Sequence, residues 1–103
     1  MFKLIYFVPV EALDTTKMAI FAAGAGQQGH YDQCAWQTLG HGQFRPLTGS
    51  NPFIGETEKL EVLEEYRVET LVDDSKIYDV LHALKQAHPY EEPAYDVIRL
   101  ENF

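Results

Sequence analysis

The side chains best suited to chemistry gather in one short stretch near the end of the chain, HPYEEPAY. It combines an imidazole nitrogen with phenol and carboxylate oxygens, atoms that can bind a divalent cation or a polar ligand. We expect His88, Tyr90, Glu91, Glu92 and Tyr95 to form a candidate ligand site at a subunit edge. Neighbouring side chains of an extended chain point apart, so only one of the two glutamates can share an ion with His88. His88 and Glu91 are therefore the candidate metal ligands.

His88 also has a purely structural explanation. It follows a predicted helix and precedes Pro89, so a protonated imidazole could stabilise the end of that helix through the helix dipole. His41 and Arg45 are two further candidates, because they lie in a stretch rich in glycine and proline and could reach a ligand from a loop. The alternative for both is an ordinary solvated loop residue.

Two other patterns predict structure rather than chemistry. The segment from Gly24 to Gly29 matches G-x-G-x-x-G, but a predicted helix precedes it and a strand follows, the reverse of a dinucleotide site. We expect a turn there. His30 and Cys34 are about 13 Å apart if extended, too far to share one metal, and Cys34 is expected to be a small core residue. No pattern suggests covalent catalysis, so no catalytic residue is predicted.

Composition narrows the possible partners. The 103 residues contain 8 Lys and Arg against 16 Asp and Glu, a formal net charge of −8. Such a charge repels nucleic acid and anionic membranes, so neither is expected as a partner. A single cysteine excludes an intrachain disulfide and fits a reducing, cytoplasmic location. The first ten residues predict neither an export signal nor a membrane span.

The elements that must position these side chains follow from hydrophobic periodicity. Apolar or alternating runs predict strands over 2–10, 31–38, 64–72 and 94–100. Helices are predicted over 11–23 and 77–88; the second carries apolar residues at helical spacing and ends at Pro89. A long Gly/Pro-rich loop is expected at about 39–61. The order describes one domain over 1–103.

This order predicts an α+β fold of the ferredoxin-like βαββαβ type. Two right-handed β-α-β units place both helices on one face of a four-stranded antiparallel sheet. The other face is left bare, and apolar residues on both sides of the first and last strands would expose hydrophobic surface. We therefore expect a homo-oligomer. The alternative is that the long loop folds back and covers the open face.

Three segments resemble a known family: Ala23–Gly55, the strand ending EEYRVETLV, and the tail AHPYEEPAYDV. Together they are similar to the inserted accessory domain of the Nif-three-like (NGG-one-interacting-factor-three-like) family, in a free-standing form. His88-Pro89-Tyr90-Glu91 followed by Pro93 is also similar to the tail motif of the CutA proteins, relatives in fold of the PII proteins. The resemblance implies a PII/CutA-like fold and, for CutA and PII, a trimer. The metal-binding core of the full-length family has no counterpart in these residues.

The leading functional hypothesis is a non-catalytic oligomeric module with a binding or regulatory role. One alternative is a CutA-like protein that binds a divalent metal ion, the single cofactor considered. A second is an accessory subunit of a metal-dependent hydrolase whose core is on another chain, which would make a protein partner necessary. In either case the chain is not expected to be a self-sufficient enzyme.

Overall fold

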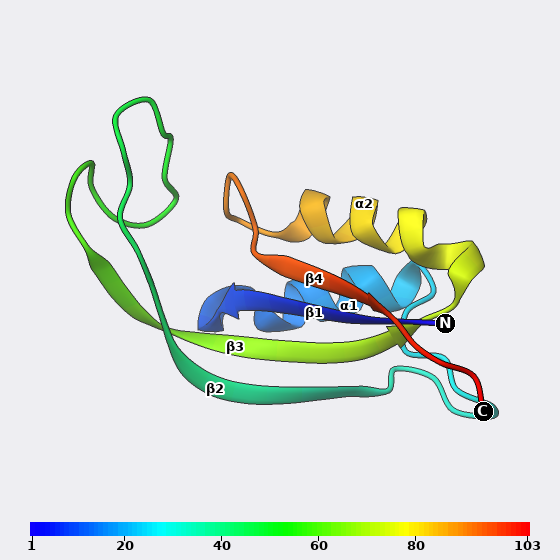
Figure 1. Ribbon diagram of the computed structural model, residues 1–103. Coiled ribbons are helices and arrows are strands. Elements are labelled where there is room, and N and C mark those ends of the chain that lie inside the picture. Colours follow the sequence, from blue (N-terminus) through cyan, green and yellow to red (C-terminus); the bar gives the residue numbers. More distant parts are fainter.

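The computed structural model describes residues 1–103 and has the predicted ferredoxin-like order (Figure 1). The strands are β1 (Phe2–Pro9), β2 (Ala35–Phe44), β3 (Glu61–Val72) and β4 (Tyr95–Arg99). The helices are α1 (Leu13–Ala22) and α2 (Ile77–Ala87), each preceded by a short 3-10 turn, Val10–Ala12 and Asp74–Lys76. Neither helix is long and apolar enough to cross a membrane.

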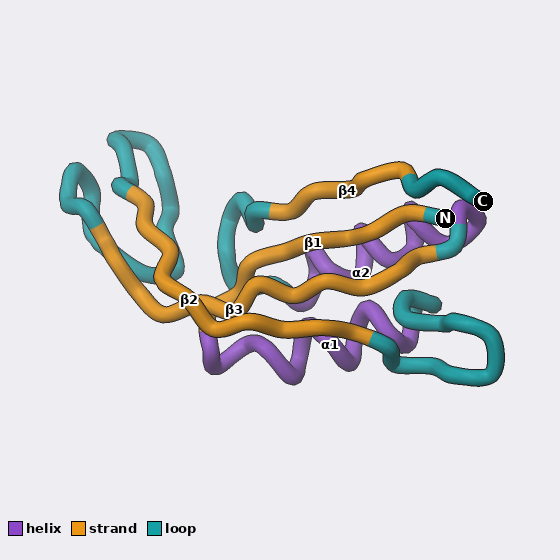
Figure 2. Tube along the Cα trace, turned by 60° about the horizontal axis from the view of Figure 1, so that its bottom comes forward, coloured by secondary structure: helices purple, strands orange, loops and turns teal.

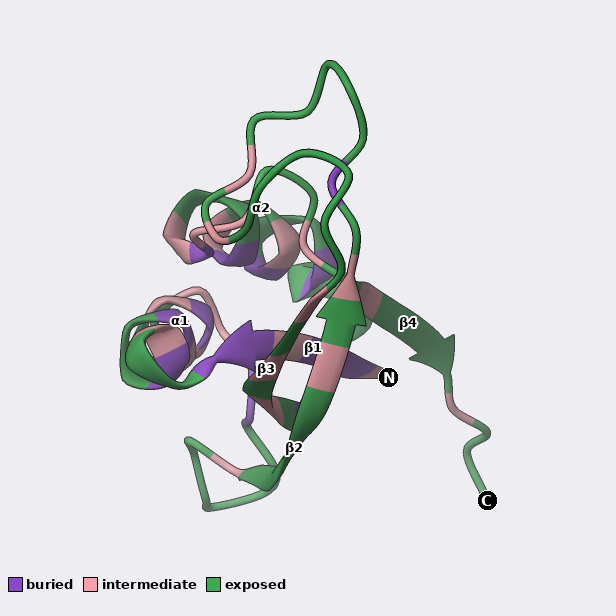
Figure 3. Cartoon of the chain, turned by 90° about the vertical axis from the view of Figure 1, so that its left-hand side faces the viewer, coloured by how far each residue is buried: buried purple, intermediate pink, exposed green.

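The four strands form one antiparallel sheet in the order β2-β3-β1-β4. β1 lies between β3 and β4, with Phe2 opposite both Val72 and Arg99. Both helices cover the same face of this sheet, and the other face is open (Figure 3). The predicted fold class is confirmed.

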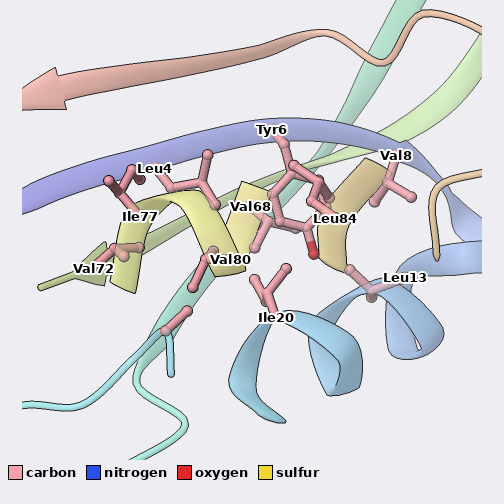
Figure 4. Packing of buried hydrophobic residues seen from close by; sticks show 11 residues of the cluster. Leu4, Tyr6, Val8, Leu13, Ile20, Val68, Val72, Ile77, Val80 and Leu84 are labelled. Carbon is pink, nitrogen blue, oxygen red and sulfur yellow. The ribbon is translucent and has the colours of Figure 1, made fainter. Parts of the chain in front are cut away.

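The core lies between the sheet and the two helices (Figure 4). Side chains alternate along β1, so Leu4, Tyr6 and Val8 all point towards the helices and are fully buried. They meet the apolar stripe of α2, in which Val80 and Leu84 are one helical turn apart. The apolar residues whose spacing predicted the strand and the helix are therefore the residues that form the core.

One buried polar pair ties α1 to the sheet. The hydroxyl of Thr16 donates to backbone carbonyls of the preceding turn, so the Tyr6 hydroxyl donates to Thr16 Oγ1 at 2.9 Å. Burial raises the pKa of Tyr6 to about 12, although the hydrogen bond with Thr16 opposes this shift. The tyrosine can therefore fill the core without leaving its hydroxyl unpaired.

The β2–β3 hairpin is longer than the sequence indicates. β2 runs to Phe44 and β3 begins at Glu61, so the connecting loop covers 45–60 rather than about 39–61. Gly40 and Gly42 fall in the stretch predicted as a Gly/Pro-rich loop, but both lie inside β2, paired with β3. The hairpin projects from one end of the body, and the molecule measures 46 × 25 × 24 Å (Figure 2).

The connection between α1 and β2 also differs from the prediction. β2 starts at Ala35, four residues after the expected start, because Tyr31 pairs back with Gln28 in a turn. The predicted turn at Gly24–Gly29 is present, and its glycines have positive φ. Cys34 is half-buried and absent from the core cluster, so its predicted place in the core was wrong.

The open face of the sheet carries both apolar and charged side chains. Trp36 on β2 is 68% exposed and Ile98 on β4 is 46% exposed. Between them, Glu69 makes long ion pairs with Lys3 and Arg67, at 3.8 and 3.7 Å. The long loop does not fold over this face; it packs against the segment between α2 and β4 instead. The alternative in which the loop covers the sheet was therefore wrong.

Candidate functional site

A cleft of about 320 Å³ opens where the loop of the hairpin meets the segment between α2 and β4. Both segments reach the same end of the molecule (Figures 1 and 2). Its walls come from the end of β1, both strands of the hairpin, the loop and the tail. The lining residues are Phe7, Gly42, Gln43, Phe44, Pro46, Ser50, Pro52, Phe53, Ile54, Glu65, Tyr90, Glu91, Glu92 and Ala94.

Tyr90 contacts three other residues of the cleft lining. Its hydroxyl donates to the Glu65 carboxylate at 2.9 Å. Its ring packs at a tilt against Phe44 and Phe53, with centroids 6.0 and 6.5 Å away. Burial raises the pKa of Tyr90 well above its usual 10.0, and the hydrogen bond with Glu65 acts in the same direction. The phenol is therefore a permanent donor that holds Glu65 in place.

Glu91 joins the loop to the tail. Its carboxylate accepts a hydrogen bond from the backbone N–H of Asn51 at 3.1 Å, across 40 residues of sequence. Glu92 lines the same cleft. These contacts bring the loop over the tail, so the cleft depends on a long-range pairing that local sequence does not specify.

His88 lies behind the cleft and is only 6% exposed. Its Nε2–H donates to the Phe7 carbonyl at 2.7 Å, and its Nδ1 accepts the N–H of Tyr90 at 3.1 Å. Burial lowers the pKa of His88 below its usual 6.5, although the bond to Phe7 and the charge of Glu65 oppose this shift. His88 is the C-cap residue of α2, as predicted, and its backbone N–H donates to the Leu84 carbonyl. Because Nδ1 accepts a hydrogen bond, the ring is neutral and bonds the Phe7 carbonyl, so the predicted protonated imidazole at the helix end was wrong. His88 instead fixes the start of the tail and thereby the position of Tyr90.

This geometry does not favour His88 as a metal ligand, because both ring nitrogens are already hydrogen-bonded. A cation would have to displace Phe7 or Tyr90. No group of three or more His, Cys, Asp or Glu side chains is close enough to hold a metal ion. The pairing of His88 with Glu91 around a divalent cation stays a prediction.

The remaining predicted residues lie outside the lining of the cleft. Tyr95 is on β4, where the Lys85 ammonium lies 5.4 Å from its ring centre. His41 is exposed on β2 and borders a separate hollow beside Arg67. Arg45 is exposed at the start of the loop. The structure thus brings together Tyr90, Glu91 and Glu92, with His88 behind them, from the predicted set.

Sequence reasoning missed Glu65, Phe44 and Phe53. The sequence gives a local signal for Glu65 alone, and that signal is Gly42. A Cβ at Gly42 would collide with the carboxylate of Glu65, so the glycine inside β2 makes room for the acid that binds Tyr90. A glycine in a strand often marks such a close approach. The register pairs Gly42 with Leu63 and Glu65 with Gly40, so the carboxylate reaches Gly42 diagonally, and only the folded side chain shows this contact.

No family model matches the chain, but individual relatives do. The GTP cyclohydrolase 1 type 2 homolog of Halalkalibacterium halodurans is 43% identical over 102 residues, which are 99% of this chain and 27% of that protein. The protein of the same name from Bacillus subtilis is 43% identical over 99 residues, 26% of its length. A Bacillus cereus protein related to NIF3 superposes with a TM-score of 0.84 at 40% identity, over 98% of this chain and 26% of that one.

The chain is a homologue of one segment of the Nif3-related proteins. It spans about a quarter of the length of the curated relatives that it matches. Distant structures agree on the fold of this Nif3-related segment. CutA from Archaeoglobus fulgidus superposes with a TM-score of 0.68 at 19% identity, over 100% of this chain and 87% of CutA. GlnK from B. subtilis has a TM-score of 0.62 at 14% identity, over 96% and 83% of the two chains. The PII/CutA-like fold is therefore confirmed.

Proposed function

We propose that this Nif3-related segment is a non-catalytic binding module whose cleft holds a small ligand. The observation that carries the proposal is the cleft itself: about 320 Å³, walled by aromatic and proline side chains, with a few polar groups at fixed positions. Volumes above about 300 Å³ with this mixture of apolar walls and convergent polar groups are typical of small-molecule sites.

The chemistry of the lining supports binding rather than catalysis. Its ionisable groups are the Tyr90 phenol, which is held protonated, and the carboxylates of Glu65, Glu91 and Glu92. The cleft contains no serine, cysteine or lysine paired with a base, the arrangement that an activated nucleophile needs. Ser50 hydrogen-bonds to the Leu47 carbonyl of its own turn.

A screen of small fragments with neutral, anionic and cationic members tests the cleft. In ¹H–¹⁵N NMR spectra, we expect shifts concentrated at residues 42–54 and 90–94. Phe53→Ala should weaken the best fragment about fivefold to tenfold, because one aromatic contact is worth about 1 kcal/mol. Phe103→Ala removes the same ring from a fully exposed position and should change nothing. Shifts scattered over the surface would reject the proposal.

The open face of the sheet supports assembly as a second part of the proposed function. Trp36 and Ile98 are exposed there, and large apolar side chains left open on one face are typical of contact surfaces. The charged side chains Lys3, Arg67 and Glu69 lie between them. In a symmetric assembly, Lys3 and Arg67 of one copy could form ion pairs with Glu69 of another. We propose a homo-oligomer, and three is the subunit number that the CutA and PII resemblance implies.

Native mass spectrometry of protein purified without a metal-affinity tag measures subunit number and bound metal together. We expect an oligomer that Trp36→Glu converts to monomer, while Tyr78→Glu, on an exposed helical position, leaves it intact. A monomer at all concentrations would contradict assembly. A divalent cation retained in the spectrum would support the metal-binding alternative.

The length of the relatives favours one further candidate function. Because the matched proteins named GTP cyclohydrolase 1 type 2 homolog are nearly four times as long, this segment could serve as an accessory to a larger enzyme. In that case, the same spectra recorded after co-expression with a separate core protein should show a hetero-complex.

A further inference from the structure

We propose that the ligand of the cleft is a small organic cation, an ammonium or guanidinium group on an apolar body. This inference rests on the proposed function, since it names the ligand class of the same cleft. Three features support it: unpaired negative charge, aromatic walls, and the absence of any competing cation among the lining residues.

The charge is unbalanced. Glu65, Glu91 and Glu92 line the cleft, and the lining includes no lysine, arginine or histidine. None of these three carboxylates takes part in an ion pair; the ion pairs of the chain involve other acids. Glu65 accepts from the Tyr90 hydroxyl and Glu91 from a backbone N–H, bonds that orient the carboxylates without neutralising them. A cationic ligand would bind the remaining carboxylate oxygens and balance their charge, whereas an anionic ligand would be repelled.

The walls favour an organic cation over a hydrated ion. Tyr90, Phe44 and Phe53 all line the cleft, and Tyr90 meets the other two rings at interplanar angles of 56° and 48°, so the rings are inclined to one another rather than stacked face to face. A cation within about 6 Å of the face of such a ring is attracted by the negative face of its quadrupole. Three cations of this chain already lie over rings: Arg99 over Phe2 at 4.4 Å, Lys85 over Tyr95 at 5.4 Å and Arg67 over Phe7 at 6.0 Å. Phe7 lines the cleft but Arg67 does not, so the rings of Phe44, Phe53 and Tyr90 are the ones left for a ligand.

A divalent metal fits these walls less well. Ca²⁺ and Mg²⁺ need about six oxygen ligands, and no group of three suitable side chains exists at any point of the chain. An organic cation needs only one or two carboxylates for its head, while its apolar body can contact Pro46, Pro52 and Ile54. The volume of about 320 Å³ suits a molecule of this size rather than a folded partner.

A matched ligand series tests the inference: 2-phenylethylammonium, neutral 2-phenylethanol and anionic 3-phenylpropanoate, titrated at low salt and pH 7.5. We expect the ammonium to bind at least tenfold more tightly than the alcohol, and the carboxylate to show no binding. Added salt should weaken the ammonium alone. If the alcohol binds as tightly as the ammonium, the cleft is a binding site without charge selection. That result overturns the inference and leaves the proposed function intact.

Charge-removing variants locate the effect. Glu65→Gln and Glu91→Gln should each reduce ammonium affinity about threefold to tenfold and leave the affinity for the alcohol unchanged. Glu64→Gln is the matched control, because Glu64 neighbours Glu65 on β3, carries the same charge and does not line the cleft. An equal loss in the control would mean that only the net charge of −8 attracts the ligand, and would overturn the inference. A Lys- or Arg-containing peptide that binds more tightly than any small amine would also overturn it, in favour of a protein partner.

Discussion

Gly26→Ala is expected to lower the free energy of unfolding by about 3 kcal/mol, measured by urea denaturation. Gly26 has a φ of +79°, a region that an L-residue enters at a cost. A Cβ there would lie 2.9 Å from the backbone nitrogen and 3.0 Å from the carbonyl oxygen of Cys34. Backbone atoms cannot swing aside as a side chain can, so the turn itself must move.

The same glycine connects three parts of the fold. Its N–H donates to the Leu71 carbonyl of β3 at 2.8 Å, and its carbonyl accepts from Cys34 N–H at 2.9 Å, just before β2. Moving the turn therefore weakens the attachment of β2. Gly29→Ala is the matched control, with a φ of +59° but no atom within 4 Å of its would-be Cβ, and should cost only about 1 kcal/mol. Equal losses for the two variants would show that the close approach is unimportant.

His88→Ala is expected to cost about 2–4 kcal/mol at pH 7.5. The substitution removes a buried ring and leaves the Phe7 carbonyl and the Tyr90 N–H without their partners. Because Tyr90 then loses its anchor, the loss of stability should come with altered NMR shifts across the cleft. His82→Ala, at an exposed position of α2, should change stability by no more than about 0.5 kcal/mol.

The pH dependence of stability provides a second test of the role of His88. Its pKa in the folded chain is lowered below 6.5, so the unfolded chain takes up the proton first as the solution is acidified. Stability is therefore fully present above about pH 6.5 and is lost as the pH falls through the folded-state value. The lowered pKa values of Asp73 and Asp74 start from 3.8, so their contribution is lost only in more acidic solution.

Urea denaturation between pH 7.5 and 5 separates the two effects. We expect the stability of the natural sequence to fall across this range, and the curve of His88→Ala to be flatter. A variant that keeps the full slope would show that the neutral imidazole is not the origin of the pH dependence.

Much of the architecture could be predicted from the chain alone, because its elements are specified locally. The alternation of Leu4, Tyr6 and Val8 and the helical spacing of Val80 and Leu84 determine which faces are buried. Short connections and right-handed crossovers then leave few topologies. The bare sheet face followed from the same rules. The ion pair of Lys3 with Glu69 did not, because it depends on the register of β1 against β3.

The binding cleft followed from the sequence only in part. The residue types of HPYEEP indicate ligand chemistry, and Tyr90, Glu91 and Glu92 do line a cleft. Which partners they meet could not be read from the tail. Glu65 is 25 residues away from Tyr90, and Asn51 is 40 residues from Glu91.

The local sequence determined the fold, the acidic charge and the set of candidate side chains, since periodicity and composition act over a few residues. Only the tertiary structure decided that His88 is a neutral, buried anchor and that the hairpin loop closes over the tail. Burial and long-range hydrogen bonds set the protonation and orientation of these groups, and both depend on neighbours that come together when the chain folds.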